Sequence, residues 1–208
     1  MICVNNIYKT IKKQKILENI SVQFEDGKCY GIVGRNGSGK TMLFRAICGY
    51  IHVDSGEVYV DGQKIRENGN FIQNAGILIG QPEFLDDLTG YENLKVLAQI
   101  KNEIDDLEIE ESLKKVKLYD ERNKKYKKYS LGMKQRLRIA QAIMEHPAIL
   151  VLDEPFNGLD KNGVEDIRYL IMQYKAEKKT ILLSSHNDED IKLLCDEIIE
   201  IEGGNIVG

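Results

Sequence analysis

Residues 34–41 place three glycines, a lysine and a threonine in the order GRNGSGKT, which fits the pattern G-x-x-x-x-G-K-[ST]. Glycines in such a loop allow the backbone N–H groups to point inward at phosphate oxygens. Lys40 adds a positive charge near the β- and γ-phosphates, and Thr41 offers a hydroxyl to Mg²⁺. A glycine-rich turn that matches by chance is the alternative. The motif predicts a site for a nucleoside triphosphate.

The neighbours of this loop have the character that the motif needs. An apolar run, 29–33, precedes the loop, and a helix-like run, 42–47, follows it. In this strand–loop–helix arrangement the positive end of the helix lies beneath the phosphates. The loop residues that we expect to bind nucleotide are Gly34, Asn36, Gly37, Ser38, Gly39, Lys40 and Thr41.

A second pair of chemical groups stands at Asp153 and Glu154, directly after the apolar run 149–152. A buried strand can hold carboxylates at its C-terminal end, beside the phosphate-binding loop. There Asp153 would hold Mg²⁺ through a water, and Glu154 would polarise an attacking water. An acidic strand end without chemistry is the alternative, but the upstream loop favours the functional interpretation.

The secondary-structure elements that must position these residues predict an α/β fold. From residue 148 onward, apolar strands alternate with helical stretches, which implies a parallel sheet with helices on its faces. The expected strands are 148–152, 180–183 and 198–201, and the expected helices are 161–176 and 188–194. Residues 1–30 read as short strands with a basic turn at 12–15. Asp61-Gly62 between two β-prone runs predicts a hairpin, so this part forms an antiparallel β-subdomain.

The stretch 89–146 is rich in Leu, Lys and Glu and predicts helices. Thr89 and Glu92 have the spacing of a capping box that opens a helix through Ile100. A second helix carries Leu107, Leu113 and Val116. We therefore expect one domain, 1–208, with an α/β core of about 1–88 and 147–208 and an inserted helical lobe of about 89–146.

Composition narrows the class of protein. The 208 residues are 42% hydrophobic and 30% charged, as in an ordinary globular domain. The net charge of −4 argues against a nucleic-acid partner. Four scattered cysteines suit reduced thiols in the cytosol. No signal peptide opens the chain, and the apolar run 148–152 is too short to cross a bilayer. Any membrane-spanning part must come from another chain.

Three further segments resemble motifs of the ATP-binding-cassette (ABC) family. Residues 129–136, YSLGMKQR, resemble the family's signature motif and lie just upstream of the acidic strand. Residues 157–160, NGLD, resemble its D-loop, and residues 184–186, SSH, resemble its switch-histidine segment. With the phosphate-binding loop and the acidic pair, five motifs stand in the family's order. The segment 85–94 resembles exporters of the drug- and bacteriocin-resistance type.

The resemblance implies roles for the matching residues. In this family two cassettes, identical or different, pair head to tail and enclose two ATP molecules. Ser130 and Gly132 would then contact the ATP that is held by the partner's phosphate-binding loop. Glu154, His186 and Asp160 would form the catalytic set. Ser130 also suits an ordinary helix N-cap, and the two interpretations are compatible.

The chain departs from the family's pattern at three places. Gly80 occupies the usual position of the Q-loop glutamine, and Gln81 follows one place later, where its amide would reach Mg²⁺ or the attacking water. Ile11 stands where an aromatic ring usually stacks on adenine, with Tyr8 three residues earlier, and we expect Ile11 to pack on the purine face. Leu131 replaces the commoner glycine of the signature.

The sequence thus predicts an ATP-hydrolysing motor subunit of an exporter, cytoplasmic and peripheral on the inner face of the membrane, acting on a separate transmembrane permease. A non-transport cassette that regulates another machine by nucleotide-dependent dimerisation is the alternative. A small-molecule kinase or a GTPase is a further rival. The signature motif argues against the kinase, and residues 123–126, NKKY, lack the Asn-Lys-x-Asp motif that reads guanine.

The segment 80–91 joins the α/β core to the helical lobe next to Gln81. Pro82 and Phe84 are residues of an exposed type here, and we expect Phe84 and Leu85 to form an apolar docking patch for a cytoplasmic helix of the permease. Phe84 packed inside the lobe is the alternative.

Overall fold

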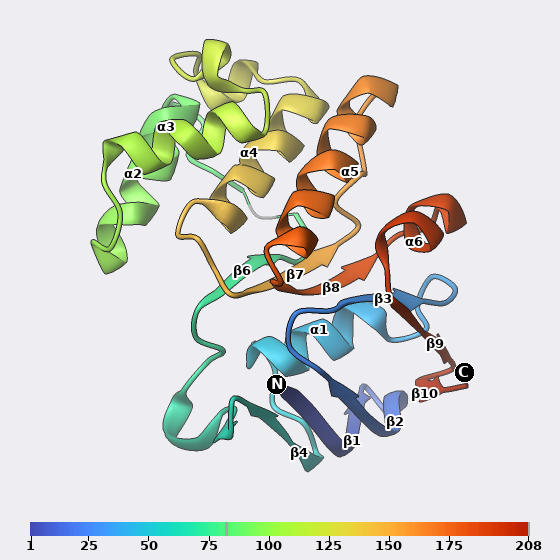
Figure 1. The fold of residues 1–208 in the computed structure, drawn as a ribbon. Coiled ribbons are helices and arrows are strands. Elements are labelled where there is room, and N and C mark those ends of the chain that lie inside the picture. The colour runs from blue at the N-terminus through green and yellow to red at the C-terminus, as the bar shows by residue number, and fades with distance from the viewer. Residues whose placement is uncertain (82, 208) are drawn as a thin grey trace.

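The computed structural model describes residues 1–81 and 83–207, and its strands form two sheets with a helix between them (Figure 1). The four-stranded sheet has the order β2-β1-β4-β5, formed by β1 (Ile2–Ile11), β2 (Gln14–Phe24), β4 (Ser55–Val60) and β5 (Gln63–Lys64). The six-stranded sheet has the order β10-β9-β3-β8-β7-β6, formed by β3 (Cys29–Val33), β6 (Ala75–Leu78), β7 (Ile149–Asp153), β8 (Thr180–Ser184), β9 (Glu197–Glu202) and β10 (Asn205–Ile206).

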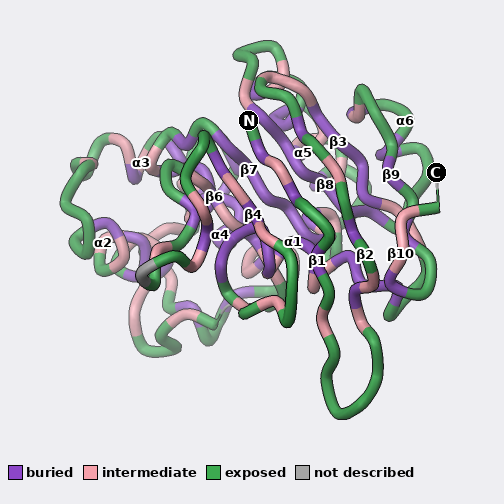
Figure 2. Tube along the Cα trace, turned by 90° about the horizontal axis from the view of Figure 1, so that it is seen from below, coloured by how far each residue is buried: buried purple, intermediate pink, exposed green. Residues whose placement is uncertain are grey.

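All pairings of the six-stranded sheet are parallel except that of β9 with β10. Its central strands are buried on both faces, as the purple traces of β7 and β8 indicate (Figure 2). Successive side chains of β7 therefore enter different cores: Leu150 and Leu152 pack with the helical side, whereas Ile149 and Val151 pack with the side of the antiparallel sheet. This period of two explains why the sequence of such a strand is continuously apolar.

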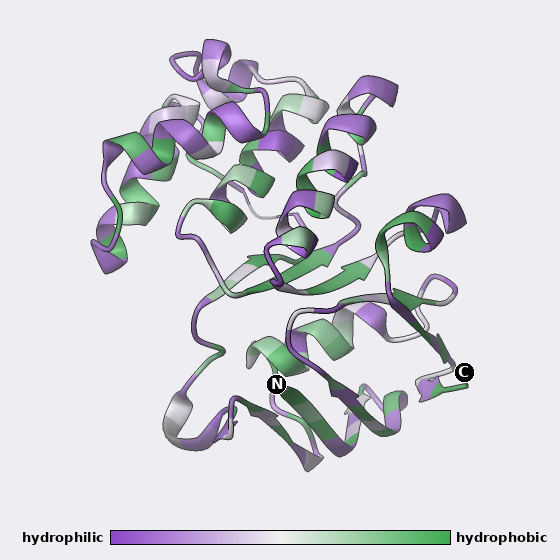
Figure 3. Ribbon diagram, in the orientation of Figure 1, coloured by the Kyte–Doolittle hydropathy of each residue, from purple (hydrophilic) through white to green (hydrophobic). Residues whose placement is uncertain are grey.

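Helices cover both faces of this sheet (Figure 1). The helix α1 (Lys40–Cys48) lies between the two sheets, and Leu43, Phe44 and Ile47 are fully buried in that core. On the other face lie α2 (Gly90–Lys101), α3 (Asp106–Lys115), α4 (Leu131–Ile143), α5 (Lys161–Ala176) and α6 (Asp188–Leu194). Their apolar sides face inward and their polar sides face outward (Figure 3).

The predicted helical lobe lies between β6 and β7 in the chain and comprises α2, α3, α4 and the short 3₁₀ helices η2 (Tyr119–Glu121) and η3 (Tyr126–Lys128). The capping box predicted for α2 is present: Thr89 Oγ1 accepts from Glu92 N, and Glu92 Oε2 accepts from Thr89 N. Asp105 and Glu108 form the same arrangement at α3. Both helices therefore begin where short polar side chains satisfy their free N–H groups.

The remaining differences from the sequence expectations are local. The first two strands are longer than expected and form a hairpin whose exposed tip extends from the body of the molecule (Figure 2). The strand β6 and the 3₁₀ helix η1 (Glu67–Gly69) were not predicted. Within the described residues, every helix is too short or too polar to cross a bilayer.

Candidate nucleotide-binding site

The loop of residues 34–39 connects β3 to α1, as the motif predicts. Gly34 has a φ of 142°, and a Cβ there would lie 2.1 Å from the carbonyl oxygen of Ile201, so a larger residue does not fit. The hydroxyl of Ser38 is buried and has no hydrogen-bond partner among the described residues. A buried polar group without a partner is costly, so this hydroxyl is a candidate to bond a ligand.

Lys40 turns back onto the loop that it follows. Its Nζ atom donates to the carbonyl oxygens of Gly34, at 2.6 Å, and Arg35, at 3.2 Å. The ammonium group is therefore hydrogen-bonded but has no acidic partner among the described residues, although the side chain is largely buried. A phosphate placed in the loop offers Lys40 a full negative charge in place of two carbonyl dipoles.

The loop and the predicted catalytic groups share one small cavity. Its volume is about 180 Å³, and it is lined by Asn36, Gly37, Gly39, Lys40, Thr41, Met42, Asp153, Glu154 and His186. These residues come from the end of β3, the start of α1, the end of β7 and the segment after β8. Ligands of open parallel sheets bind at such carboxyl ends of strands. The structure thus brings together most of the predicted site residues.

Asp153 is held on both oxygens. Thr41 Oγ1 donates to its Oδ2 at 2.6 Å, and Ser184 Oγ donates to its Oδ1 at 2.7 Å. Ser184 is opposite Asp153 in the parallel pairing of β7 with β8, and its side chain is completely buried. The sequence motifs predict no separate role for Ser184. The only signal in the sequence is that a hydroxyl ends the strand that follows the acidic strand.

Glu154 and His186 face each other. Glu154 Oε2 accepts from the backbone N–H of His186 at 3.2 Å, and His186 Nε2 lies 3.1 Å from Oε1. Those two atoms are within ion-pair distance but outside hydrogen-bonding geometry, so Oε1 is a buried acceptor without a hydrogen bond among the described residues. Burial raises the pKa of the Glu154 carboxyl above its ordinary value, and His186 acts in the opposite direction.

The backbone of Glu154 is also unusual, with a φ of 54°. Non-glycine residues adopt this left-handed conformation rarely, and such strain clusters at functional sites. The backbone N–H of Glu154 donates to Ser184 Oγ at 3.0 Å, which helps to hold this conformation. The last residue of β8 therefore positions both acids at the end of β7, Asp153 within the strand and Glu154 directly after it.

The oxygen donors beside the loop fit a magnesium ion. Mg²⁺ prefers oxygen ligands, keeps several waters and takes one or two protein ligands together with phosphate oxygens. Thr41 and Asp153 place a hydroxyl and a carboxylate in contact. Among the described residues, no group of three or more His, Cys, Asp or Glu side chains forms a complete metal cage. This sparse donor set suits an ion that arrives with a nucleotide.

The signature segment, residues 129–136, lies outside that cavity. Ser130 is the exposed N-cap of α4, and its Oγ accepts from Met133 N at 3.2 Å. Gly158 has a φ of 79°, and a Cβ there would lie 2.6 Å from Leu131 Cγ, so the D-loop packs closely on the start of α4. Asp160 is the N-cap of α5 and accepts from Gly163 N. Ser130, Gly132 and Asp160 are thus absent from the cavity lining.

The two displaced family positions also lie outside the cavity lining. Ile11 ends β1 at the hairpin tip, with 41% of its surface exposed. Gln81 is exposed in the connection between β6 and α2. In the same connection Pro82 lies outside the described residues, Phe84 stacks edge-on against Tyr126 with 5.3 Å between ring centres, and Leu85 is 59% exposed.

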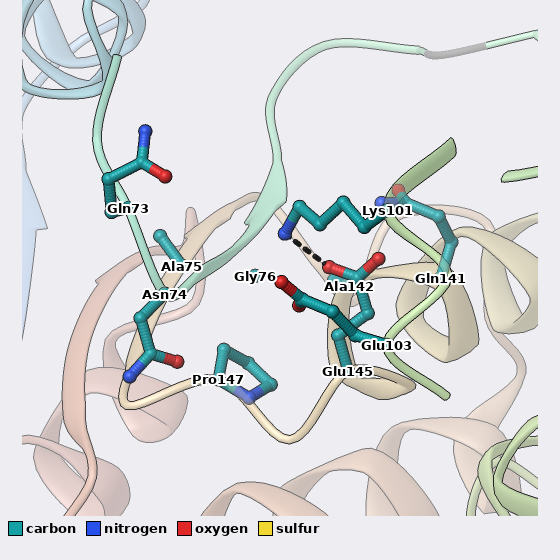
Figure 4. Close-up of a pocket in the computed structure, with 10 residues that line it drawn as sticks. All are labelled: Gln73, Asn74, Ala75, Gly76, Lys101, Glu103, Gln141, Ala142, Glu145 and Pro147. Atoms are coloured by element: carbon teal, nitrogen blue, oxygen red, sulfur yellow. Dashed lines mark hydrogen bonds and ion pairs between the residues drawn. The ribbon is translucent and has the colours of Figure 1, made fainter. Parts of the chain in front are cut away.

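A larger pocket lies elsewhere, at the N-terminal ends of β6 and β7 and the C-terminal ends of α2 and α4 (Figure 4). Its volume is about 480 Å³, and the Lys101–Glu145 ion pair, 2.6 Å long, crosses it. No residue of the phosphate-binding loop lines it. Its size does not make it the nucleotide site, because the predicted chemical groups lie at the opposite end of the parallel strands.

The strand–loop–helix, the paired acids and the parallel sheet define a P-loop nucleoside triphosphatase. More narrowly, the chain belongs to the ABC transporter family, whose sequence profile matches residues 17–157. It is an ATP-binding subunit with ATPase activity, and the predicted family resemblance is confirmed.

Three relatives support this assignment. The chain is 43% identical over 206 residues to the uncharacterized ABC transporter ATP-binding protein YybJ of Bacillus subtilis (strain 168), covering 99% of this chain and 94% of YybJ. It is 37% identical to the bacitracin transport ATP-binding protein BcrA of Enterococcus faecalis, covering 97% of this chain but 66% of BcrA. It is 33% identical to the lantibiotic transport ATP-binding protein SrtF of Streptococcus pyogenes, covering 100% of this chain and 89% of SrtF.

Solved structures have the same fold. The chain matches the dimeric structure of MJ0796, a bacterial ABC transporter cassette, with a TM-score of 0.90 and 25% identity, covering 100% of this chain and 97% of that chain. The match to the same cassette in a post-hydrolysis state bound to ADP and Pi has a TM-score of 0.90 and 24% identity, with the same coverage.

Proposed function

We propose that this chain is the motor subunit of an exporter, working as a head-to-tail pair of cassettes on a separate permease at the inner face of the membrane. The observation that carries the pairing is the exposure of Ser130 at the start of α4, away from the cavity that holds the loop and the acids. A capped helix start with free N–H groups suits a γ-phosphate. When two copies pair, the start of α4 of one copy would complete the nucleotide site of the other.

Within each site the residues divide the work. Lys40 and the loop N–H groups bind the β- and γ-phosphates. Thr41 and Asp153 would hold Mg²⁺, which would neutralise charge on the phosphates. Glu154 accepts a proton from the attacking water, because its buried carboxyl with a raised pKa is a stronger base than an ordinary glutamate. His186 lies next to Glu154 and is placed to hydrogen-bond the γ-phosphate. Gln81 and Asp160, which lie outside the cavity lining, would contribute from the adjoining segments.

The contact with the permease is proposed on the connection between β6 and the lobe. Leu85 is exposed there. A nearby apolar groove of about 380 Å³ is lined in part by Tyr50, Ile79, Leu97 and Ile100. A cytoplasmic helix of a permease would bury an apolar face in such a groove. The names of the bacitracin and lantibiotic transport relatives support a transport role for the assembly.

The test is to determine whether a neighbouring reading frame encodes a multi-span protein and to co-express the chain with that protein. We expect the two proteins to purify together from detergent-solubilised membranes, and ATP hydrolysis to be lost in the Glu154→Gln variant. ATPase activity with no membrane-bound partner would favour the regulatory alternative. An absence of hydrolysis in the intact complex would contradict the proposal itself.

A further inference from the structure

A buried acid next to the catalytic site has no part in the chemistry described so far. Asp190, in the first turn of α6, is only 2% exposed. A buried carboxylate is costly unless it is paired and hydrogen-bonded. Arg168 of α5 provides that pairing: its Nε donates to Asp190 Oδ1 at 2.7 Å, and a second guanidinium nitrogen lies 2.5 Å from the same oxygen.

The other oxygen of Asp190 reaches the segment that carries His186. Ser185 Oγ donates to Asp190 Oδ2 at 2.7 Å. The same hydroxyl accepts from the backbone N–H of Asn187 at 3.1 Å. The hydroxyl of Ser185, the residue before His186, is thus hydrogen-bonded to the backbone of Asn187, the residue after it. The path from Arg168 to the histidine consists of an ion pair, one hydrogen bond and one peptide unit.

The two serines before His186 point to different partners. Ser184 donates to Asp153, the predicted Mg²⁺ ligand, whereas Ser185 donates to Asp190. His186 follows them and donates its own N–H to Glu154. The segment 184–187, which we call the switch loop, is therefore held by the acidic strand on one side and by α6 on the other.

Helix capping does not explain the burial of Asp190. The N-cap of α6 is Asn187, whose side chain accepts from Glu189 N at 2.9 Å. Asp188 and Glu189 already place negative charge in the first turn. Asp190 instead directs its two oxygens at Arg168 and Ser185. Asp190 therefore links α5 to the switch loop, with one carboxylate oxygen bonded to each.

We propose that Asp190, fixed by Arg168, is a positioning residue that sets the place of His186 by accepting the hydrogen bond from Ser185. The inference rests on the role proposed above for His186. Without the hydrogen bond from Ser185 to Asp190, the switch loop keeps its contacts with the acidic strand but loses its contact with α6. His186 is then no longer held at a fixed distance from the γ-phosphate. Small displacements of a group that acts on the reacting atoms cost rate rather than binding.

The test compares the ATPase kinetics of Ser185→Ala and Asp190→Asn in the complete assembly. We expect kcat to fall about 10-fold or more while KM changes by less than about 2-fold, because orientation is lost and the phosphate-binding loop is intact. Ser185→Thr, which keeps the hydroxyl, restores kcat. Should one variant misfold, the other carries the test.

The matched control is Asp196→Asn. Asp196 follows α6 and also accepts from a cation of α5, because Lys175 Nζ lies 2.7 Å from its Oδ1, but it has no contact with the switch loop among those described. We expect Asp196→Asn to lower the melting temperature without lowering kcat. An equal loss of kcat in Asp196→Asn and Asp190→Asn would assign Asp190 a purely structural role and overturn the proposal.

A double-mutant cycle with His186→Ala separates the two proposals. If Asp190 acts through His186, Ser185→Ala causes no further loss of kcat in the His186→Ala background. Additive losses overturn the positioning role but leave the function of His186 intact. Normal hydrolysis by His186→Ala contradicts the proposed role of His186 and the positioning proposal with it.

Discussion

Thr41 Oγ1 donates to Asp153 Oδ2 at 2.6 Å, although 112 residues separate the two in the chain. Both residues are expected to hold Mg²⁺, and this bond places their oxygens side by side. The ammonium group of Lys40 donates to the carbonyl oxygens of Gly34 and Arg35 in its own loop. Hydrogen bonds thus join residues that are expected to bind ATP and Mg²⁺.

Replacing Lys40 by Ala should weaken ATP binding by about 100-fold or more, because charge-assisted hydrogen bonds to the phosphates are lost. Equilibrium binding of a fluorescent ATP analogue measures this. Lys192→Ala, which removes an exposed lysine of α6, is the control and should bind normally. Near-normal affinity in Lys40→Ala would contradict the assignment of the loop.

Glu154→Gln should retain ATP binding and lower hydrolysis by about 100-fold or more, since an amide of the same shape is a poor base. If hydrolysis is what separates the paired cassettes, ATP-bound dimers then accumulate. Size-exclusion chromatography with light scattering, with and without ATP, detects them. Hydrolysis at the normal rate would refute the proposed role of Glu154.

The same variant should change how stability depends on pH. Burial raises the pKa of Glu154 in the folded protein, so folding favours its protonated form. That contribution is complete below the pKa of the unfolded chain and is lost as pH rises through the raised pKa. At neutral pH Glu154→Gln should therefore melt at a higher temperature than the unmodified protein, and the difference should vanish near pH 4. A constant difference across this range would argue against the raised pKa.

Ser130→Arg tests the trans arrangement. The variant should bind ATP as a monomer but lose at least about 10-fold in hydrolysis, because the added bulk keeps the start of α4 from the partner's γ-phosphate. In a mixed dimer with Lys40→Ala, both lesions fall in one composite site and the other site is intact. An equal mixture should recover up to roughly one quarter of normal activity. No recovery would argue against head-to-tail pairing.

Variants of Phe84 and Leu85 test which of the two side chains packs inside the helical lobe and which contacts the permease. The contact of Phe84 with Tyr126 favours packing in the lobe, so Phe84→Ala should destabilise the protein by about 1–3 kcal/mol, less than a fully buried phenylalanine does. Leu85→Ala should leave the melting temperature unchanged and weaken co-purification with the permease. Thermal melting and affinity purification distinguish the two. Normal co-purification of Leu85→Ala would remove Leu85 from the docking surface.

The sequence predicted most of the elements because their signals are local. The helices 161–176 and 188–194 begin and end where expected, since Asp160 and Asn187 cap them. The acidic strand and the phosphate-binding loop were recognisable for the same reason: each is a short motif whose chemistry needs its own spacing.

The parts that escaped prediction depend on contacts between distant segments. The bond from Ser184 to Asp153 follows from the register of β7 with β8, which no spacing within either strand encodes. The bonds from Lys40 to the carbonyl oxygens of Gly34 and Arg35 depend on the path of the loop backbone, which the residue types of the motif do not specify. The short strand β6 has an alternating burial pattern over four residues, too few to separate it from a loop.

The left-handed backbone of Glu154 limits which mutations this position can accept. Asn, Asp and Gly adopt that conformation most readily, yet each has a shorter side chain that withdraws the functional group from His186. Val and Ile fit neither the backbone nor the chemistry. Gln is the substitute that keeps the length, and we expect it to yield a folded subunit that binds ATP without hydrolysing it. In the paired assembly proposed above, such an inactive subunit still pairs with an active one and blocks it. A mutation of this kind should therefore be dominant, whereas loss of the whole chain should be recessive.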